Sequence, residues 1–512
     1  MKWKVAPKKC TDLTEQLLVN RGIKTPVEKE QFFNPKISDF EKDLNISGIE
    51  KAQKRIADAI KKGELIVVFG DYDVDGICAC AILYKSLTFL GAKVLPYIPH
   101  REKEGYGLSK VGLDSARASG ASLIITVDNG IVASEQAKYA KEIGLDLIIT
   151  DHHLPQEKLP DAYSIVHSTK MCGAAVAWCL VREIIKKELA HELLQFVALA
   201  TVCDLIPLVG LGRAFVFEGL KVLNRTTNLG LLALVNESGI KLGNIGSFEL
   251  GYILGPRLNA IGRLKHAIDA LRLLCTKDVN KARNLAKLLS ETNSLRQEMT
   301  IRAMEEAKVL VTAESKIHIV SSKSWSVGII GLIAGKITDQ YSRPTIAISI
   351  GETMSKGSAR SVDGINIVEL IRSCADILVD VGGHPGAAGF SILNEHIEIF
   401  KKRLEVKMIS ISVKEPVLKI DAQIQTNQIT KRLVSELEKF EPFGFGNPRP
   451  IFATHGMEIS DIRTVGEGRH LKFKADNIDA IAFAMGQLQP TLTNGQQIDL
   501  AYTPEIDTYN GS

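Results

Sequence analysis

The sequence predicts an α/β protein with a parallel-sheet lobe, a long connecting helix, a second α/β lobe and a small C-terminal β-barrel. Short apolar runs alternate with helical patterns from residue 51, and residues 278–313 contain neither Gly nor Pro. From about residue 415 the pattern changes to short strands separated by Pro and Gly turns. At roughly 150 residues per domain, the 512 residues suffice for about three domains.

The first lobe is expected over residues 51–277. Its strand 65–69, LIVVF, is a short apolar run of the kind that parallel sheets bury. Helices are expected over 77–90, 109–119 and 132–143, and the further strands over 92–97, 122–127 and 145–150. Helical patterns then fill 173–203, and a Gly-rich, mixed stretch runs to about 275. Strands that alternate with helices predict a parallel sheet covered on both faces.

The second half of the chain begins with the predicted helix over 278–313. At about 50 Å it is long for a helix inside one domain, so we interpret it as a connector between two lobes. The second lobe, 314–408, is expected to hold strand 316–321, helix 328–340, strand 345–349 and a Gly-rich tail. Residues 415–512 are expected to form the barrel. Residues 1–50 are interpreted as a mixed leader.

Composition narrows the class of protein. Hydrophobic residues make up 45% and charged residues 24%, which excludes a disordered or collagen-like chain. The net charge of +4 is too small to predict a nucleic-acid partner by itself, although it leaves room for a local basic groove. No apolar run reaches the ~20 residues of a membrane span, and no signal-peptide core follows the basic start. The eight cysteines form no CxxC pair, which argues against structural zinc, and we expect a cytoplasmic protein.

Acidic and histidine motifs follow the predicted strands. They are Asp71, Asp73 and Asp75 in GDYDVDG, Asp128 in VDNG, the triplet Asp151-His152-His153, and Asp204 in ATVCDLIPL, which we also expect at a strand end. Ligands of open parallel sheets bind beyond the carboxyl ends of strands, so these side chains are expected to meet in one crevice. Clustered carboxylates repel one another, and a divalent cation removes that cost. Oxygen ligands with imidazole suit Mn²⁺ or Mg²⁺, and a shared carboxylate such as Asp128 could bridge two ions about 4 Å apart.

Each motif also has a simpler interpretation. DxDxDG resembles an EF-hand loop, but Ile82 stands where such a loop needs Glu, and a strand precedes it. Asp128 alone is typical of a helix N-cap. The histidine pair alone is often a surface feature, and Asp204 alone could be a satisfied buried carboxylate. The joint pattern favours a metal site.

The chain resembles the DHH phosphoesterase family, and within it the RecJ exonucleases. The resemblance extends over roughly residues 40–505 and rests on an ordered set of motifs: GDYDVDG, VDNG, DHH, PRLNAIGRL, GSARS, GGHPGAAGF and PFGFGNPRPIF. It implies a DHH lobe, a DHHA1-type second lobe and an OB-like barrel. It further implies degradation of single-stranded DNA from the 5′ end to 5′-mononucleotides in recombination and repair. Two Mn²⁺ or Mg²⁺ ions, a single-strand-binding protein and a RecQ-type helicase are expected with it, and we expect a monomer.

The resemblance also implies site residues. The metal ligands would be Asp71, Asp73 and Asp128 for one ion, and Asp75, Asp128, His152 and Asp204 for the other. Some branches of the family carry His at the position of Asp71. The implied catalytic residues are Asp73, Asp75, Asp128, His152, His153, Asp204 and His384, with His153 contacting a phosphate or supporting the ligands. Ser326 departs from the pattern, because many relatives carry His after the preceding Trp.

Further residues are expected to bind the nucleic acid: Arg257, Asn259, Arg263, Arg360, His384 and Arg449. His384 lies in a glycine-dense segment whose amides can approach a phosphate, or which is only a tight turn. Arg360 suits bidentate phosphate binding, or forms a surface salt bridge. The PRLNAIGRL residues either line the path of the strand or tie the linker to the first lobe. Of the aromatics near Arg449, Phe452 is expected in the core and Phe445 is left open between core and base stacking.

Other functions remain possible at this point. DHH phosphodiesterases that act on short oligonucleotides, cyclic dinucleotides or adenosine bisphosphate are shorter and lack the barrel. A DHH pyrophosphatase is disfavoured by the Gly-rich tail, and a non-catalytic repair scaffold by the acceptable ligand positions. The chain stops at Tyr509-Asn510-Gly511-Ser512, where Asn-Gly predicts a hairpin turn that no strand follows. We therefore expect the barrel to be truncated.

Overall fold

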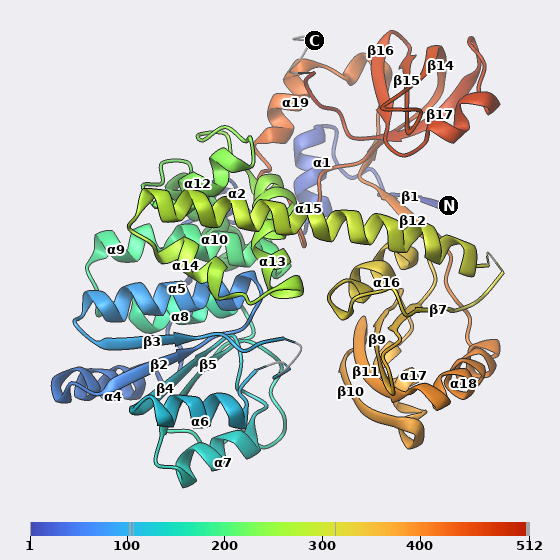
Figure 1. Ribbon diagram of the computed structural model, residues 1–512. Coiled ribbons are helices and arrows are strands. Elements are labelled where there is room, and N and C mark those ends of the chain that lie inside the picture. Colours follow the sequence, from blue (N-terminus) through green and yellow to red (C-terminus); the bar gives the residue numbers. More distant parts are fainter. Residues whose placement is uncertain (1, 102–103, 106, 313, 508–512) are drawn as a thin grey trace. The chain divides into compact units, whose positions relative to one another are not determined.

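The computed structural model describes residues 2–101, 104–105, 107–312 and 314–507 (Figure 1). The chain divides into two units, one of Lys36–Glu415 and one that joins Met1–Pro35 to Pro416–Ser512. Among the described residues, no helix combines the length and the apolar character that crossing a lipid bilayer requires.

The first lobe is built on a five-stranded sheet in the order β3-β2-β4-β5-β6, with every pairing parallel. The strands are β2 (Leu65–Phe69), β3 (Lys93–Tyr97), β4 (Ala121–Val127), β5 (Asp146–Asp151) and β6 (Ser164–His167). The predicted parallel sheet is confirmed, and β6 is an additional strand. Because β3 and β4 lie on opposite sides of β2, a crevice for a ligand is expected at the carboxyl ends of β2 and β4.

Helices cover both faces of this sheet. They are α4 (Ile49–Lys62), α5 (Val74–Phe89) and α8 (Gly173–Val181) on one face, and α6 (Lys110–Ala118) and α7 (Ser134–Glu142) on the other. Strand β2 alternates accordingly: Ile66 and Val68 enter the core with α5, and Val67 and Phe69 enter the core with α6. Helix α5 begins earlier than the apolar pattern predicted, because the side chain of Asp73 caps it.

The stretch expected to be mixed up to residue 275 is mostly helical. Two helices precede this stretch, α9 (Lys187–Glu192) and α10 (Leu194–Cys203). The stretch itself holds α11 (Gly210–Leu223), α12 (Leu229–Glu237), the π-helix η2 (Glu249–Leu254), α13 (Gly255–Leu264) and α14 (Ile268–Cys275). Its glycines serve close packing. A Cβ on Gly219 would lie 2.4 Å from the Leu194 carbonyl oxygen, and one on Gly230 would lie 1.9 Å from that of Leu273.

The connector is confirmed as α15 (Val279–Leu310), a single helix of 32 residues and about 48 Å. Ala282, Ala286 and Leu289 near its start belong to the core of the first lobe. Ala303 and Ala307 near its end pack in a second core with Trp325 of the second lobe.

The second lobe has a mixed sheet in the order β10-β11-β9-β8-β7. Its strands are β7 (His318–Ser322), β8 (Thr345–Ser349), β9 (Met354–Arg360), β10 (Leu378–His384) and β11 (Ala387–Leu393). Only β7 and β8 pair in parallel, so the Gly-rich tail supplies the antiparallel part of the sheet. The helices are α16 (Val327–Tyr341), α17 (Ile367–Arg372) and α18 (Ile397–Ile409).

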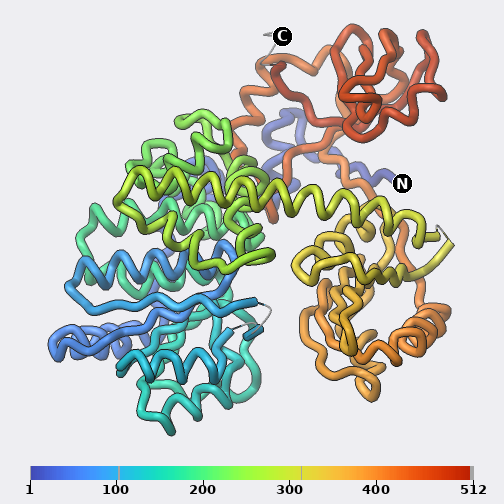
Figure 2. The backbone as a smooth tube through the Cα atoms, viewed as in Figure 1, coloured from blue at the N-terminus to red at the C-terminus, as the bar shows by residue number. Residues whose placement is uncertain are grey.

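The other unit combines the two ends of the sequence (Figure 2). Strand β1 (Lys2–Val5) pairs in parallel with β12 (Val417–Ile420). Leu17 and Leu18 of α1 (Leu13–Asn20) and Phe32 of α2 (Pro26–Phe33) share a core with Phe440 and Phe452. The barrel-like sheet consists of β13 (Ala422–Gln423), β14 (Phe452–Val465), β15 (His470–Ala475), β16 (Ile478–Ala482) and β17 (Gln497–Tyr502), with α19 (Lys431–Glu438) beside β13 in the sequence.

Short helical segments complete the chain: η1 (Ile37–Phe40), α3 (Glu41–Leu44), η3 (Ala375–Ile377), η4 (Asn394–His396), η5 (Thr426–Gln428) and η6 (Gly486–Thr491). The predicted turn at Asn510-Gly511 lies outside the described residues.

Candidate metal centre

The segment that runs from the loop after β2 into the first turn of α5 carries three carboxylates in five residues. Asp71 is 1% exposed, and Asp73 accepts a hydrogen bond of 3.0 Å from the Gly76 amide as the N-cap of α5. A Cβ on Gly76 would lie 2.6 Å from the Asp71 amide nitrogen, so this position requires glycine. Burial and then the charge of Asp73 raise the pKa of Asp71 well above its ordinary value.

Asp75 lies in the first turn of α5 and is also buried. Its carboxylate accepts the amide hydrogens of Gly173 at 2.6 Å and Ala174 at 2.7 Å, where α8 begins. The amides and dipole at a helix N-terminus favour an anion. Burial nevertheless raises the pKa of Asp75, helped by the charge of Asp73 and opposed by His152.

Asp128 follows β4 in a left-handed backbone conformation, with a φ of 62°. Its amide donates to the Thr150 carbonyl oxygen at 3.0 Å. It is not a helix N-cap, because α7 begins only at Ser134. Burial, and then the charges of Asp75 and Asp73, raise the pKa of Asp128 well above its ordinary value. A strained backbone that carries a buried carboxylate is typical of a functional position.

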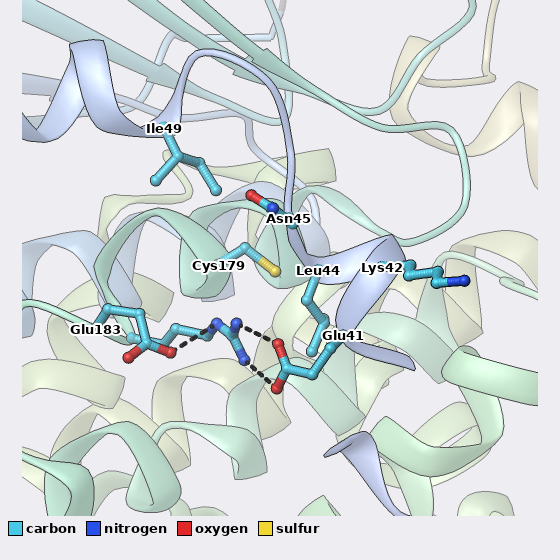
Figure 3. A pocket seen from close by; sticks show the side chains of 8 residues that line it. Glu41, Lys42, Leu44, Asn45, Ile49, Cys179 and Glu183 are labelled. Carbon is cyan, nitrogen blue, oxygen red and sulfur yellow. Dashed lines mark hydrogen bonds and ion pairs between the residues drawn. The ribbon is translucent and has the colours of Figure 1, made fainter. Parts of the chain in front are cut away.

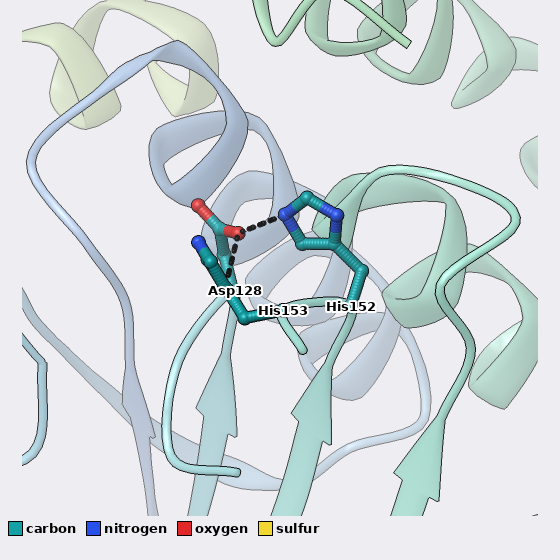
Figure 4. A group of neighbouring side chains, drawn as sticks. All are labelled: Asp128, His152 and His153. Atoms are coloured by element: carbon teal, nitrogen blue, oxygen red, sulfur yellow. Dashed lines mark ion pairs between the residues drawn. The ribbon is translucent and has the colours of Figure 1, made fainter. Parts of the chain in front are cut away.

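His152 joins these carboxylates from the end of β5 (Figure 4). Its Nε2 lies 3.1 Å from Asp128 Oδ1, 3.5 Å from Asp204 Oδ2 and 3.6 Å from Asp75 Oδ2. Burial lowers the pKa of His152, which favours the neutral imidazole that a cation needs.

Asp204 was expected at a strand end, and that expectation is wrong. It lies at the C-cap of α10, because the apolar run before it is a buried helix, and periodicity does not distinguish such a helix from a buried strand. Burial, and then the charges of Asp75 and Asp73, raise the pKa of Asp204 to about 9.

Asp151 orients the second histidine. It accepts the amide hydrogens of Ile131 at 2.8 Å, of His152 at 2.7 Å and of His153 at 3.1 Å, and it contacts His153 Nδ1 at 2.8 Å. Burial opposes protonation of His153 most strongly, but the hydrogen bond to Asp151 and the charges of Asp151, Asp75 and Asp73 together raise the pKa of His153. Asp151 therefore fixes the ring beside Asp128 (Figure 4).

Three groups of side chains could each hold a divalent cation, with ligand atoms within 4.8 Å of one another. They are Asp71, Asp73 and Asp128; Asp75, His152 and Asp204; and Asp128, His152 and His153. Asp71 Oδ1 and His152 Nε2 are buried, and no described residue forms a hydrogen bond with either atom. Because buried polar atoms without partners are costly, the donor set fits cations. Carboxylate oxygens with imidazole suit Mn²⁺ or Mg²⁺.

Arginines gather close to these acids. The guanidinium of Arg101 lies 4.9 Å from the ring centre of Tyr72, which stands between Asp71 and Asp73. Burial, and then the charges of Arg101, Arg296 and Arg360, lower the pKa of Arg263 to about 10. Within the described ranges, none of these four arginines forms an ion pair with a carboxylate. A guanidinium group without a carboxylate partner keeps the paired donors that suit a phosphate group.

Arg101 and Arg296 are not among the residues predicted from the sequence. Arg101 follows β3, so the strand-end reasoning that found the acids applies to it as well. Arg296 lies inside the uniform pattern of α15, and no sequence feature distinguishes it from the other basic residues of that helix.

The PRLNAIGRL residues form α13. Asn259 accepts the amide hydrogen of Val74 at 3.1 Å and so holds the acidic loop. Arg257 donates to Ser290 Oγ at 3.2 Å and to the Ile253 carbonyl oxygen at 2.7 Å, which ties α13 to its neighbours. Arg263 donates to the Gly328 carbonyl oxygen of the second lobe at 3.2 Å.

In the second lobe, Arg360 ends β9 opposite Ala387, and His384 ends β10 opposite the same residue. His384 is exposed at the tip of this hairpin, and among the described residues it forms no hydrogen bond or ion pair with the acidic cluster. Ser326 caps α16 and accepts the Gly328 amide hydrogen at 3.2 Å.

Arg449 belongs to the other unit. It forms ion pairs with Glu505 and Glu441, and its guanidinium lies 5.4 Å from the Phe443 ring centre. Phe452 is buried as predicted, and Phe445, left open by the sequence, is 60% exposed.

A separate pocket of about 530 Å³ opens beside α3 and the end of α8 (Figure 3). Lys42 and Arg182 are the cations that line it, and Arg182 pairs with Glu41 at 2.9 Å and with Glu183 at 3.3 Å. The Asp75 contacts lie at the opposite end of α8.

Three family models match the chain: the DHH family N-terminal domain over 65–201, the DHHA1 domain over 307–409 and the RecJ OB domain over 420–512. Among curated proteins, the single-stranded-DNA-specific exonuclease RecJ of Bacillus subtilis is 36% identical over 98% of the chain. The chain spans 66% of the length of that relative. RecJ of Escherichia coli is 29% identical, with 99% of the chain and 95% of the relative covered.

A solved structure and a further curated relative agree with these matches. The crystal structure of RecJ in complex with Mn²⁺ from Thermus thermophilus has a TM-score of 0.87 and 28% identity, and it covers 100% of this chain and 78% of that one. The curated RecJ of Haemophilus influenzae is 32% identical over 91% of the chain and 88% of its own length. The chain therefore belongs to the RecJ family of single-stranded-DNA-specific exonucleases.

Proposed function

We propose that this chain hydrolyses single-stranded DNA from the 5′ end and releases 5′-mononucleotides in recombination and repair. One observation carries the proposal: Asp128 belongs to two groups of ligands in a member of an exonuclease family. A shared carboxylate between two ions is the geometry that phosphoryl transfer uses. The polarity and the product rest on the resemblance of the motifs.

The proposed ligands are Asp71, Asp73 and Asp128 for one ion and Asp75, Asp128, His152 and Asp204 for the other. Related RecJ structures were solved with Mn²⁺ and with Mg²⁺, which supports these two cations here. When bound, the two ions would polarise the scissile phosphate, activate water and stabilise the leaving 3′-oxygen.

The chain's own residues bind and orient the substrate. His153, held by Asp151 and with a raised pKa, is proposed to donate a hydrogen bond to a phosphate oxygen. Arg263 and Arg360 are proposed to hold phosphates of the strand, because neither has a carboxylate partner among the described residues. His384 is proposed to reach a phosphate from its hairpin, and Arg449 to contact the strand from the OB-like domain.

We propose a catalytic domain over 51–277, a connector over 278–313, a DHHA1 domain over 314–408 and an OB-like domain over 415–512. The ranges of the family models support this division. A cytoplasmic location, a monomeric state and cooperation with a single-strand-binding protein and a RecQ-type helicase are proposed from the resemblance alone.

Digestion of matched oligonucleotides, labelled at the 5′ or the 3′ end, tests the proposal. With Mn²⁺ or Mg²⁺ we expect immediate release of labelled mononucleotide from the 5′-labelled strand and gradual shortening of the 3′-labelled strand. Chelator should stop both reactions, and duplex DNA should persist. Cleavage restricted to dinucleotides or cyclic dinucleotides would instead indicate a phosphodiesterase, and binding without cleavage a scaffold.

A further inference from the structure

Two large aromatic side chains lie exposed next to each other in the unit Lys36–Glu415, which we call the catalytic unit. Phe248 is 57% and Tyr252 74% exposed. Their ring centres are 5.0 Å apart and their planes differ by 25°, so the rings are stacked. Exposed aromatic surface of this size is unfavourable in water unless a ligand covers it.

The pair belongs to an unusual segment of backbone. Phe248 is the N-cap of the π-helix η2, and Tyr252 lies inside it. Leu250 and Leu254 anchor the other side of this helix in the main core. π-Helical turns are rare and concentrate at functional sites. The segment therefore presents the two rings outward from a rigid base.

The segment contacts elements that carry the acidic cluster. Cys203, the residue before Asp204, lies with its Sγ 3.6 Å from the Leu250 carbonyl oxygen. A Cβ on Gly255 would lie 2.4 Å from the same sulfur, so the Gly255 backbone approaches the Cys203 side chain closely. Farther along, Asn259 accepts the Val74 amide hydrogen at 3.1 Å in the acidic loop. The aromatic pair is thus tied to the metal centre at two points.

A nucleobase fits this surface better than a protein side chain does. Arg263 lies near the end of α13, which follows η2 directly in the chain, so a strand held by Arg263 as proposed above would carry its bases past the same helical segment. An enzyme that shortens a strand must accept every base in turn, which excludes recognition by base edges. Stacking on an aromatic ring meets this requirement, because every base has a π-face.

We propose that Phe248 and Tyr252 form a stacking platform for one base of the single strand, within the first several nucleotides from the scissile phosphate. This inference rests on the proposed function. The two side chains are positioning residues: they hold the strand in register and take no part in bond breaking.

The test uses the full chain with Tyr252→Leu, which keeps an apolar side chain without a ring, and Tyr252→Phe, which keeps the ring. Phe89→Leu, at an exposed phenylalanine on α5, is the matched control. For Tyr252→Leu we expect KM to rise roughly 5- to 100-fold with kcat within about twofold, as loss of one base–aromatic stack predicts. Tyr252→Phe and Phe89→Leu should resemble the wild type.

Substrates with a single abasic nucleotide, placed in turn at each of the first ten positions, identify the stacked base. In the wild type one position should raise KM to the level of Tyr252→Leu, and in that variant the same substitution should add nothing. Equal abasic penalties in both proteins at every position would overturn the platform.

The experiments distinguish a failure of the proposed function from a failure of the stacking platform. A wild type that hydrolyses no oligonucleotide overturns the proposed function, whatever Tyr252 does. In that case 2-aminopurine placed at each of the same positions still reports stacking in the metal-free protein. Fluorescence quenching at one position, lost in Tyr252→Leu and kept in Tyr252→Phe, supports the platform, and its absence at every position rejects it.

Discussion

Asp128 joins a buried carboxylate to a left-handed backbone and takes part in two groups of ligands. Asp128→Asn keeps the shape of the side chain but removes the charge that two cations would share. We expect single-strand hydrolysis to fall at least about a hundredfold at saturating Mn²⁺. Circular dichroism should show an unchanged fold. Asp161→Asn, at an exposed ion pair with Lys141, is the control. Activity within tenfold of wild type would contradict the shared-ligand assignment.

The pKa shifts predict how pH affects the stability of the metal-free protein. Burial and mutual repulsion raise the pKa values of Asp71, Asp75, Asp128 and Asp204 in the folded state, that of Asp204 to about 9. An unfolded carboxyl group releases its proton near pH 4. Between about pH 4 and 9 the folded chain binds more protons than the unfolded chain, so these groups lower the free energy of unfolding as pH rises.

In chelator, calorimetry should therefore show a midpoint temperature that falls from pH 5.5 to 8.5. Saturating Mg²⁺ should reduce the slope, because the cation keeps the carboxylates ionised in the folded state. Asp204→Asn in chelator should reduce it as well. A flat profile in chelator would show that the four groups ionise normally.

At the residue scale, the sequence predicted the acids but not their surroundings. Five site residues could be predicted because each lies just after an apolar run that indicates a buried strand, or at the start of the helix that follows it. They are Asp71, Asp73, Asp75, Asp128 and His152. The left-handed backbone of Asp128 and the close approach of α8 to it were not predictable. Arg296 was not either, because its place near Arg263 results from the folding of two distant segments.

At the scale of elements, the start of α8 sets the spacing of the metal centre. A Cβ on Gly173 would lie 2.6 Å from that of Asp128, and the Gly173 amide donates to Asp75. Gly173→Ala should displace both carboxylates, with a loss of stability of about 1–3 kcal/mol and a larger loss of metal affinity. Titration of Mn²⁺ followed by calorimetry measures both. Gly335→Ala in α16, where a Cβ meets only the Arg360 side chain at 4.0 Å, should change neither.

A second prediction at the scale of elements concerns the β10–β11 hairpin. His384→Ala should lower kcat more than it weakens binding, since a donor that acts mainly on the transition-state phosphate produces that pattern. His396→Ala, at a partly exposed histidine of the same lobe, is the control. Rapid-quench kinetics under saturating DNA separate the two constants. An unchanged kcat with weaker DNA binding would limit His384 to holding the strand.

Strand and helix types were predictable where apolar periodicity was regular, as in β2, β4 and α15. Residues 204–275 were less predictable, because glycine usually marks turns. Gly219 and Gly230 instead lie inside helices, where they let a carbonyl oxygen of a neighbouring helix approach. One sequence cannot distinguish these two uses of glycine.

At the scale of the whole molecule, residues 2–35 belong with the C-terminal unit. Removing them takes β1 away from β12 and uncovers the core around Phe440 and Phe452. We expect the truncated chain to lose the calorimetric transition of that unit while that of Lys36–Glu415 stays within a few degrees. Proteolysis should then cut within residues 416–507 first. Two unchanged transitions would mean that residues 2–35 contribute little to the unit.

The packing of residues 2–35 against the C-terminal unit could not be predicted from the sequence. The pattern of Leu17, Leu18 and Phe32 is an ordinary amphipathic one, and it does not indicate which segment packs against these side chains. The residues that cover them come about 400 positions later in the sequence. The barrel itself was predictable from the short strands separated by Pro and Gly turns, and Lys472 and Lys474 occupy one face of its strand β15.

The pairing of β1 with β12 also imposes an order of events during synthesis. The ribosome makes residues 2–5 first, but their partner strand, 417–420, emerges only after the whole catalytic unit has been translated. At 5–20 residues per second, β1 waits roughly 20 to 80 s for β12. The catalytic unit can complete its own core within that time. The unit that joins residues 2–35 to 416–507 therefore folds after the catalytic unit, and chaperones that bind exposed apolar segments have long access to Leu17, Leu18 and Phe32.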